Sequence, residues 1–185
     1  MIIRHSEEKD FERMMEIYEY ARGFMAETGN PNQWGPTNWP PEGLIRDDIK
    51  QGHSYVCEED GHVVGTFYFI YGKDIEETYV DITDGEWSSD EAYGVVHRLA
   101  SDRSVKGIGT CCLEWAFEQC GHIRIDTHTD NAVMQNLLEK LGYTKRGIIY
   151  VVEDNYPRFA YDKRAVLHAE KAAEEVLKNK ETILS

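Results

Sequence analysis

A short glycine-bearing loop carries the residue types that bind phosphate. Residues 103–109 read Arg-Ser-Val-Lys-Gly-Ile-Gly and lie between a predicted strand and a predicted helix. A glycine turn that opens a helix presents free backbone N–H groups at the positive end of the helix dipole, which suits a pyrophosphate. Glycine near a helix start is also a common packing device, so the loop alone is weak evidence. It is neither a P-loop nor a Rossmann loop, because Cys112 stands where the latter needs its third glycine.

The elements after the loop add a more specific pattern. The helix that the loop opens is expected to run to about Cys120, and Ile-Arg-Ile-Asp-Thr-His at residues 123–128 alternates like a half-buried strand. Asn131 can cap the next helix, which ends before Leu-Gly-Tyr at residues 141–143. Together these features are far more diagnostic than two glycines.

In this combination the chain resembles the GNAT superfamily of N-acetyltransferases. The family pattern is Arg/Gln-x-x-Gly-x-Gly/Ala after a strand, then helix, strand, Asn, helix and Leu-Gly-Phe/Tyr, and its counterpart here begins at Ser104. An Asp-Gly hairpin at residues 60–61, the start at 2–4 and the ending at 158–163 also look like the family. The resemblance covers residues 2–161 and implies an acyl-CoA N-acyltransferase fold, a central mixed twisted sheet with helices on both faces.

The resemblance implies acetyl-CoA as the cofactor and assigns residues to it. The backbone of Leu99 and Ala100 would pair with the pantetheine arm, and a nearby N–H would polarise the thioester carbonyl. Asn131 would bond the pantetheine in addition to capping its helix. The residues that would hold the pyrophosphate are Val105, Gly107, Ile108, Gly109 and Thr110, supported by Arg103 or Lys106.

Two positions depart from the family pattern. Ser104 stands where Arg or Gln is usual, so Arg103 or Lys106 would have to replace a contact with phosphate. Leu138 stands where many members carry the Tyr that protonates the departing thiolate. A thiol with a pKa near 8.5 leaves as thiolate with little help at neutral pH. The alternative acids are Tyr143, Tyr150 and Tyr161.

An amine acceptor needs a base, because its solution pKa is roughly 10 if it resembles lysine. His97 is the first candidate: it lies on the strand that feeds the loop, and alternation puts it on one face with Val95 and Leu99. A structural histidine is the competing interpretation, since the chain has seven histidines. The weaker candidates are Glu91, Asp81 and Glu58.

The loop after the first helix commonly closes over the acceptor in the family. By this resemblance the acceptor pocket would be lined by Gln33, Trp34, Tyr68 and Tyr71, although an aromatic core residue is the plainer interpretation for any one of them. The expected acceptor is a primary amine of a small molecule or a peptide.

Periodicity predicts the elements that must position these residues. Helices are expected from Ser6 to about Met25 and over residues 42–51, followed by a hairpin with a type I′ Asp-Gly turn and a strand from Tyr93. A small strand at residues 79–82 and a last strand pair at 143–145 and 147–152 complete the list.

This order predicts one α/β or α+β domain over residues 1–162, with a mixed sheet and helices on both faces. Residues 163–185 are expected to form a helical tail with a narrow apolar face. Such a tail docks on its own domain or on a second subunit, which makes a homodimer an expectation.

Composition excludes some partners. The formal net charge of −14 disfavours non-specific binding to nucleic acid or anionic membranes and favours a cationic acceptor, although an acidic surface also keeps a protein soluble. No apolar stretch of about 18 residues and no signal peptide occur, so we expect a cytoplasmic protein without a membrane segment. The four cysteines lack the spacing of a metal site and are expected to be core residues.

Two other functions stay open. Ser104 and Leu138 suit a non-catalytic module that binds or senses acyl-CoA. A structural domain that uses its C-terminal helix to bind a partner is the third interpretation.

Overall fold

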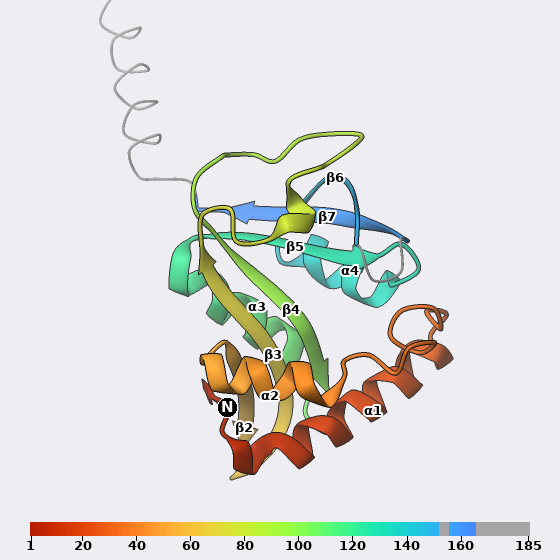
Figure 1. Cartoon of the computed structure of the whole chain (residues 1–185), viewed down its shortest axis with the longest axis vertical. Helices are drawn as coiled ribbons and strands as arrows, with labels where there is room; N and C mark the ends of the chain where they lie inside the picture. Colours follow the sequence, from red (N-terminus) through yellow and green to blue (C-terminus); the bar gives the residue numbers. More distant parts are fainter. Residues whose placement is uncertain (152–155, 166–185) are drawn as a thin grey trace, which may run out of the picture.

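A computed structural model describes residues 1–151 and 156–165, and these form a seven-stranded mixed sheet in the order β1-β2-β3-β4-β5-β7-β6 (Figure 1). Among the described strands, β4 and β5 are the one parallel pair of neighbours. The strands are β1 Ile2–His5, β2 Ser54–Glu59, β3 His62–Gly72, β4 Tyr93–Ser101, β5 His122–His128, β6 Thr144–Tyr150 and β7 Pro157–Arg164. The helices are α1 Phe11–Glu27, α2 Glu42–Gln51, α3 Ile108–Cys120 and α4 Ala132–Lys140, with 3₁₀ turns η1 Glu8–Asp10 and η2 Glu77–Tyr79. The predicted mixed sheet is confirmed.

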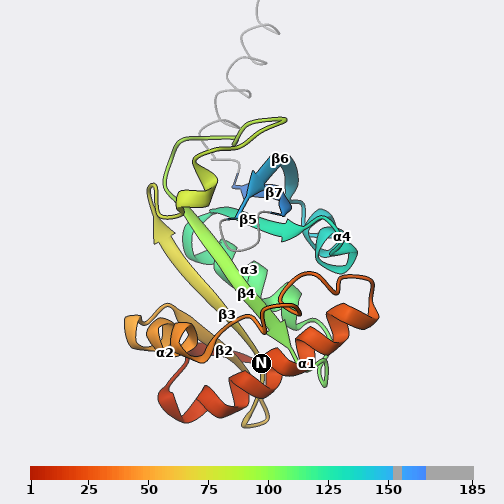
Figure 2. The same ribbon diagram turned by 45° about the vertical axis from the view of Figure 1, so that its right-hand side comes forward.

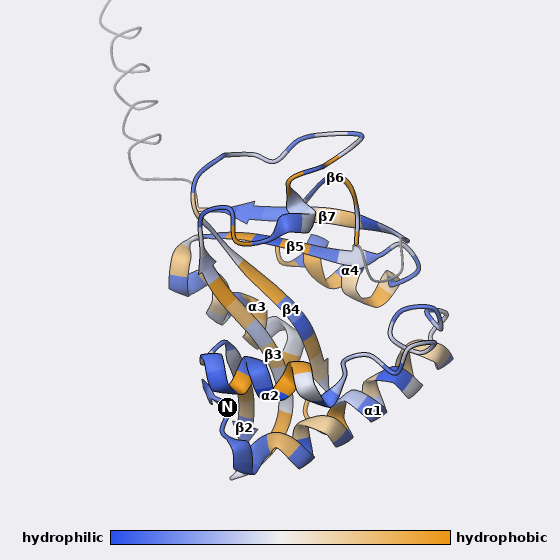
Figure 3. Ribbon diagram, in the orientation of Figure 1, coloured by the Kyte–Doolittle hydropathy of each residue, from blue (hydrophilic) through white to orange (hydrophobic). Residues whose placement is uncertain are grey.

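The helices cover opposite faces of the sheet (Figure 2). On one face, Met14 and Ile17 of α1 and Ile45 of α2 pack with Ala100 of β4. On the other face, side chains of α3 and α4 pack in a cluster that includes Leu113. The β3 and β4 strands contain hydrophobic stretches, whereas the segment that connects the two strands is largely hydrophilic (Figure 3). The sheet is therefore the central layer of the core.

The hairpin between β2 and β3 forms as its turn residues require. Asp60 and Gly61 have φ of 50° and 77°, the positive values that a type I′ turn needs. The β2–β3 register shifts between Cys57 and Glu58, which confirms a bulge beside Gly65. A Cβ on Gly65 would lie 2.5 Å from Cγ2 of Ile108, so this glycine also lets β3 approach α3.

The start of the first helix differs from the prediction. The chain enters α1 through η1, where Asp10 accepts a hydrogen bond of 2.8 Å from the backbone N–H of Glu7. Arg4 of β1 donates to both carboxylate oxygens of Asp10, at 2.7 and 2.9 Å. The hydroxyl of Ser6 has no hydrogen-bond partner in the described part of the chain, so the predicted Ser6 cap is wrong. The carboxylate of Asp10, which also pairs with Arg4 of β1, takes the place of the Ser6 cap.

Three other expectations need correction. Residues 79–82 do not form a strand, because η2 ends at Tyr79 and the nearby contact is a single bridge from Thr83 to Ile148. Residues 144–150 form one strand, β6, with a bulge at Arg146, and its partner is β7. Lys163 and Arg164 belong to β7 and not to the tail, and Ala165 is in no helix. Residues 166–185 of the predicted helix lie outside the described residues.

Two of the four cysteines, Cys57 and Cys112, are core residues, and the other two are half-buried. Cys57 and Cys112 are fully buried and free, and their Sγ atoms lie 3.2 Å apart. Of the helices that the structure describes, none has the length and apolar character required to cross a bilayer.

Candidate active site

The β4 strand contains one extra residue at the centre of the molecule. Tyr68 of β3 pairs with His97 and Thr66 pairs with Ala100, so β4 has one residue more than β3 across this interval. Arg98 takes up the irregularity with a φ of 53°, in the left-handed region that residues other than glycine rarely adopt. A β-bulge therefore follows His97 directly.

The bulge changes which side chains share a face. Val95 packs in a cluster with Tyr79, and His97 lies 6.1 Å from the ring of Tyr79. Leu99 instead packs with Val96 in the cluster on the α3 side of the sheet. The predicted common face of Val95, His97 and Leu99 is therefore wrong for Leu99, because the extra residue reverses the alternation.

The β4 and β5 strands separate just before the bulge. Their parallel pairing consists of Gly94 with Ile123 and Val95 with Arg124, whereas β5 continues to pair with β7 along its whole length. Figure 1 shows β4 and β5 diverging beyond this point. From Val96 onward, the β4 backbone thus has no ladder partner in β5 within the described strands. Unpaired strand groups of this kind can bind an extended ligand.

The predicted phosphate loop lies at the N-terminus of α3. Gly107 has a φ of 87°, and a Cβ built on it would meet no described heavy atom within 4 Å. The first amides of α3 lack partners inside the helix, as at any helix start. Arg103 and Lys106 are exposed beside them. These exposed donors and cations fit the pyrophosphate of CoA.

Other residues of the loop support its shape. The side chains of Val105 and Ile108 pack in the α3-side core, and Thr110 is half-buried in the first helical turn. A Cβ on Gly109 would lie 2.9 Å from Cδ2 of Leu137, so this glycine permits the close approach of α3 and α4. Ser104 turns back toward Asp102, whose Oδ1 accepts from the Ser104 amide at 2.9 Å and its hydroxyl at 2.6 Å.

Asn131 joins α4 to the loop that follows α1. Its Oδ1 accepts from the backbone N–H of Met134 at 3.0 Å, which caps α4 as predicted. Its Nδ2 donates to Oε1 of Gln33 at 3.0 Å. Trp34 lies against α1, where its ring is 5.9 Å from that of Tyr18. Gln33 is therefore beside a predicted cofactor residue, whereas Trp34 is half-buried and packs on the edge of the α1-side core.

His97 lies between two carboxylates that come from different elements. Its Nε2 is 2.8 Å from Oε2 of Glu76, just before η2, and its Nδ1 is 3.8 Å from Oδ1 of Asp126 on β5. The hydroxyl of Tyr79 donates to the same Asp126 oxygen at 2.8 Å. The ring of Tyr68 stacks near His97, with centroids 6.1 Å apart. This His97 cluster, formed by these five residues, is the candidate catalytic centre.

The protonation of Glu76 determines which nitrogen of His97 carries the proton. Burial raises the pKa of Glu76, but contacts with His97 and Thr78 outweigh burial and lower that pKa to about 2. Glu76 is therefore an ionised carboxylate, which can only accept a hydrogen bond. Nε2 of His97 must donate, so in a neutral ring Nδ1 holds the lone pair.

Asp126 is held from two sides. Burial raises the pKa of Tyr79 well above its ordinary value, so the phenol keeps its proton and remains a donor to Asp126. Nε of Arg158 lies 3.9 Å from the other oxygen of Asp126. Carboxylates fixed beside an imidazole stabilise the imidazolium that forms when the ring accepts a proton. The His97 cluster can thus act as a general base.

Sequence comparison places the chain among known proteins. The sequence model of the Acetyltransferase (GNAT) family matches residues 15–143, which include the predicted phosphate loop and Asn131. The chain belongs to the GNAT acetyltransferase family. It is therefore an acetyltransferase that depends on acyl-CoA, and this family generally uses acetyl-CoA. No functionally curated protein matches the sequence significantly.

Solved structures agree with this assignment. A GNAT family acetyltransferase from Streptococcus agalactiae is 32% identical, with a TM-score of 0.80 over 89% of this chain and 95% of the other. A GNAT family acetyltransferase from Listeria monocytogenes is 16% identical, with a TM-score of 0.63 over 89% and 94%. A ribosomal-protein-alanine N-acetyltransferase from Brucella melitensis is also 16% identical, with a TM-score of 0.57 over 89% and 100%. The latter two support the fold alone.

The predicted acids of this GNAT protein lie in different environments. Tyr143 is buried in the α3-side core, burial raises its pKa, and its hydroxyl has no hydrogen-bond partner among the residues that the structure describes. Tyr161 is 1% exposed and Tyr150 is 51% exposed. Leu138 is fully buried. A catalytic role for Tyr143 stays a prediction.

The weaker base candidates lie outside the His97 cluster. Glu58 pairs with Arg4 at 3.0 Å, and Glu91 pairs with Arg164. Asp81 is exposed on the segment that follows η2. Tyr71 of β3, a residue predicted to line the acceptor pocket and not to act as a base, is 55% exposed. His97 is the base candidate that the structure surrounds with other polar groups.

Sequence reasoning missed Glu76, Tyr79 and Asp126. Asp126 had a usable signal, because it is an acid within an alternating strand that otherwise reads as half-buried. Glu76 and Tyr79 had none, since they lie in an acidic segment without periodicity. Their position depends on how that segment folds back over the sheet.

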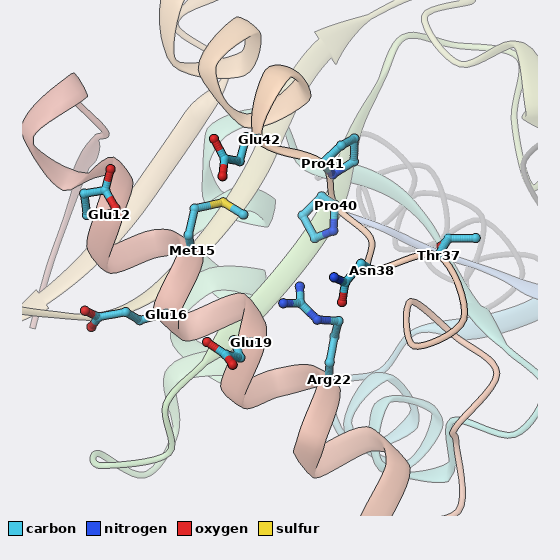
Figure 4. A pocket seen from close by; sticks show the side chains of 10 residues that line it. All are labelled: Glu12, Met15, Glu16, Glu19, Arg22, Thr37, Asn38, Pro40, Pro41 and Glu42. Carbon is cyan, nitrogen blue, oxygen red and sulfur yellow. The ribbon is translucent and has the colours of Figure 1, made fainter.

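A separate open groove of about 520 Å³ lies between α1, the loop that precedes α2, and the start of α2 (Figure 4). Its lining includes four glutamates, which are Glu12, Glu16, Glu19 and Glu42. None of its lining residues belongs to the His97 cluster. These four glutamates give this face of α1 a negative charge.

The phosphate loop can be tested with a matched pair of glycine substitutions. Gly107→Ala should weaken CoA binding at least roughly tenfold, because it adds a methyl group to the open turn that precedes the α3 amides and strains the positive φ of that turn. Gly52→Ala is the control, since Gly52 also has a positive φ, 74°, and an open surrounding. Each should lower the free energy of unfolding by about 1 kcal/mol. Calorimetric titration with CoA measures the difference, and equal dissociation constants for the two variants would refute the assignment.

The low pKa of Glu76 makes a prediction about acid stability. Its folded-state pKa of about 2 lies below the ordinary 4.5, so its contribution is full above 4.5 and disappears as the pH falls toward 2. Glu76→Gln should therefore destabilise the protein by about 3 kcal/mol at about pH 6 and by clearly less at about pH 3.5. Urea unfolding measures both values. Glu77→Gln, at an exposed neighbour, is the control; a pH-independent loss for Glu76→Gln would contradict the account.

Proposed function

We propose that this GNAT protein transfers an acetyl group from acetyl-CoA to a primary amine by direct attack within a ternary complex. The observation that carries the proposal is the hydrogen bond of 2.8 Å between Nε2 of His97 and the ionised Glu76. It leaves Nδ1 as the basic nitrogen on the strand that leads into the phosphate loop. The acceptor is a small molecule or a peptide.

Acetyl-CoA, when bound, supplies the activated acetyl thioester. The α3 amides with Arg103 and Lys106 would bind its pyrophosphate, and Asn131 together with the β4 backbone at Leu99 and Ala100, which has no ladder partner in β5 within the described strands, would bind the pantetheine. A backbone N–H of the bulge donates to the thioester carbonyl, where negative charge develops during acyl transfer.

His97 performs the proton transfer. An alkyl amine has a pKa of roughly 10 and is cationic near neutral pH, so it must lose a proton to become a nucleophile. The ammonium group loses this first proton to solvent. As the neutral amine attacks the thioester carbonyl and the C–S bond breaks, Nδ1 of His97 accepts the second proton from the amine nitrogen, and Glu76 and Asp126 stabilise the resulting imidazolium. The thiol of CoA, with a pKa near 8.5, leaves as the thiolate without an acid at Leu138.

Charge favours a cationic acceptor. The chain has a formal net charge of −14, and both Glu76 and Asp126 flank the proposed base. Their potential attracts an ammonium group toward Nδ1 and disfavours an anionic acceptor. Tyr68, beside His97, and Gln33 and Trp34, on the loop after α1, are proposed to contact the acceptor.

Replacement of His97 tests the proposal. His97→Gln should lower kcat/KM for an amine acceptor by roughly 10²- to 10⁴-fold and leave KM for acetyl-CoA nearly unchanged, because the base acts on the acceptor. The assay follows release of free thiol, and His62→Gln, at an exposed histidine of the β2–β3 turn, is the control.

A panel of primary amines separates this function from its alternative. Turnover of at least one amine, lost in His97→Gln, supports N-acetylation. Binding of acetyl-CoA with no turnover on any amine would contradict it and favour the acyl-CoA-sensing module that Leu138 suggests.

A further inference from the structure

The strained residue of the β4 bulge is an arginine. Arg98 has a φ of 53°, a conformation that glycine adopts freely and that a side chain makes unfavourable. It directly follows His97, on the part of β4 that has left β5. Non-glycine residues in this region persist where surrounding contacts fix them, and such sites are often functional.

The side chain of Arg98 is fixed by contacts with two other elements. Its Nη2 lies 2.7 Å from Oδ2 of Asp48 on α2, and its guanidinium lies 4.4 Å from the ring centre of Tyr68 on β3. The side chains of Arg98 and Asp48 are only 12% and 8% exposed. Burial raises the pKa of Asp48 even though Arg98 opposes this change. The pair is thus largely removed from water, and neither partner can be lost without leaving the other uncompensated.

Tyr68 connects the Arg98–Asp48 pair to His97. The Tyr68 ring has Arg98 near it and also stacks near His97, so β3, α2 and the base share one set of contacts. The backbone of Arg98 belongs to the bulge whose N–H groups the proposed function directs at the thioester carbonyl. A glycine would allow the same φ but would not hold it.

We infer that Arg98 and Asp48 are positioning residues: their buried pair holds the β4 bulge so that its backbone N–H points at the acetyl carbonyl. This inference rests on the proposed function, in which the bulge supplies that donor. It differs from a purely structural clamp because it predicts a loss in the chemical step and not only in folding. Loss of one such donor costs roughly 10²- to 10³-fold in kcat, so partial misplacement should cost about 10- to 100-fold.

Kinetics give the first readout. Arg98→Met should lower kcat about 10- to 100-fold and change KM for acetyl-CoA less than about threefold, since the phosphate loop is untouched. Asp48→Asn should act in the same direction. Arg98→Lys should recover part of the loss, because it keeps the charge but not the planar guanidinium.

The carbonyl vibration gives a readout that needs no acceptor. Acetyl-CoA labelled with ¹³C at the carbonyl is bound to the full chain, and isotope-edited infrared spectra record its C=O stretch. A donated hydrogen bond lowers this frequency. The wild-type protein should show the lowered frequency, whereas Arg98→Met and Asp48→Asn should return it toward the value in water.

A second arginine supplies the matched control. Arg146 lies at the bulge of β6, and its Nε donates to the fully buried Asp162 at 2.6 Å. Arg146→Met removes an ion pair with a buried carboxylate at a bulge outside the His97 cluster, so it should lower stability but change neither kcat nor the carbonyl frequency. If Arg98→Met does not fold, Asp48→Asn carries the test.

The outcomes separate the two proposals. An unchanged carbonyl frequency and kcat in folded Arg98→Met or Asp48→Asn would overturn the positioning role, whatever the acceptor. A lowered frequency in the wild type that these variants lose, with no turnover of any amine, would support the positioning role and overturn the proposed function. Equal kinetic losses in Arg146→Met would show a general stability effect and contradict the inference.

Discussion

The one-residue surplus in β4 is the constraint on which the rest of the site depends. Because β4 has an extra residue opposite β3 just after His97, Leu99 turns toward α3, while His97 keeps the face of Val95 and lies toward Tyr79 and Asp126. The strand has also separated from β5 by this point, so beyond Val95 it has no described ladder partner in β5, although it still pairs with β3. The proposed base and a β4 edge without a described β5 partner thus lie next to each other at this irregularity.

Charge pairing maintains this arrangement in a poorly solvated region. His97 contacts Glu76 and Asp126, and Arg98 contacts Asp48. Each pair joins different elements, so the elements position the charges and the charges in turn hold the elements. Isolated charges would be costly to bury, whereas opposed charges with hydrogen bonds are tolerated. The fold and the proposed proton transfer therefore use the same contacts.

Local features could be predicted from the sequence, whereas contacts between distant segments could not. The Asp60-Gly61 turn and the Asn131 cap follow from backbone chemistry within a few residues, and both are present. The bulge at Arg98 has no such local signature, since an arginine at positive φ is held by Asp48, 50 positions earlier in the chain. The contact of Glu76 with His97 likewise has no local signal in the sequence. Strict alternation consequently misplaced Leu99, although it placed His97 correctly with Val95.

We propose that Glu76 fixes the proton of His97 on Nε2 and leaves Nδ1 as the base. Nitrogen-15 NMR of the histidine rings tests this directly, with the His97 signals identified by their absence from His97→Gln. At the pH of maximal activity, we expect a protonated Nε2 and an unprotonated Nδ1. A proton on Nδ1 with a bare Nε2, or a doubly protonated ring throughout the active pH range, would contradict it.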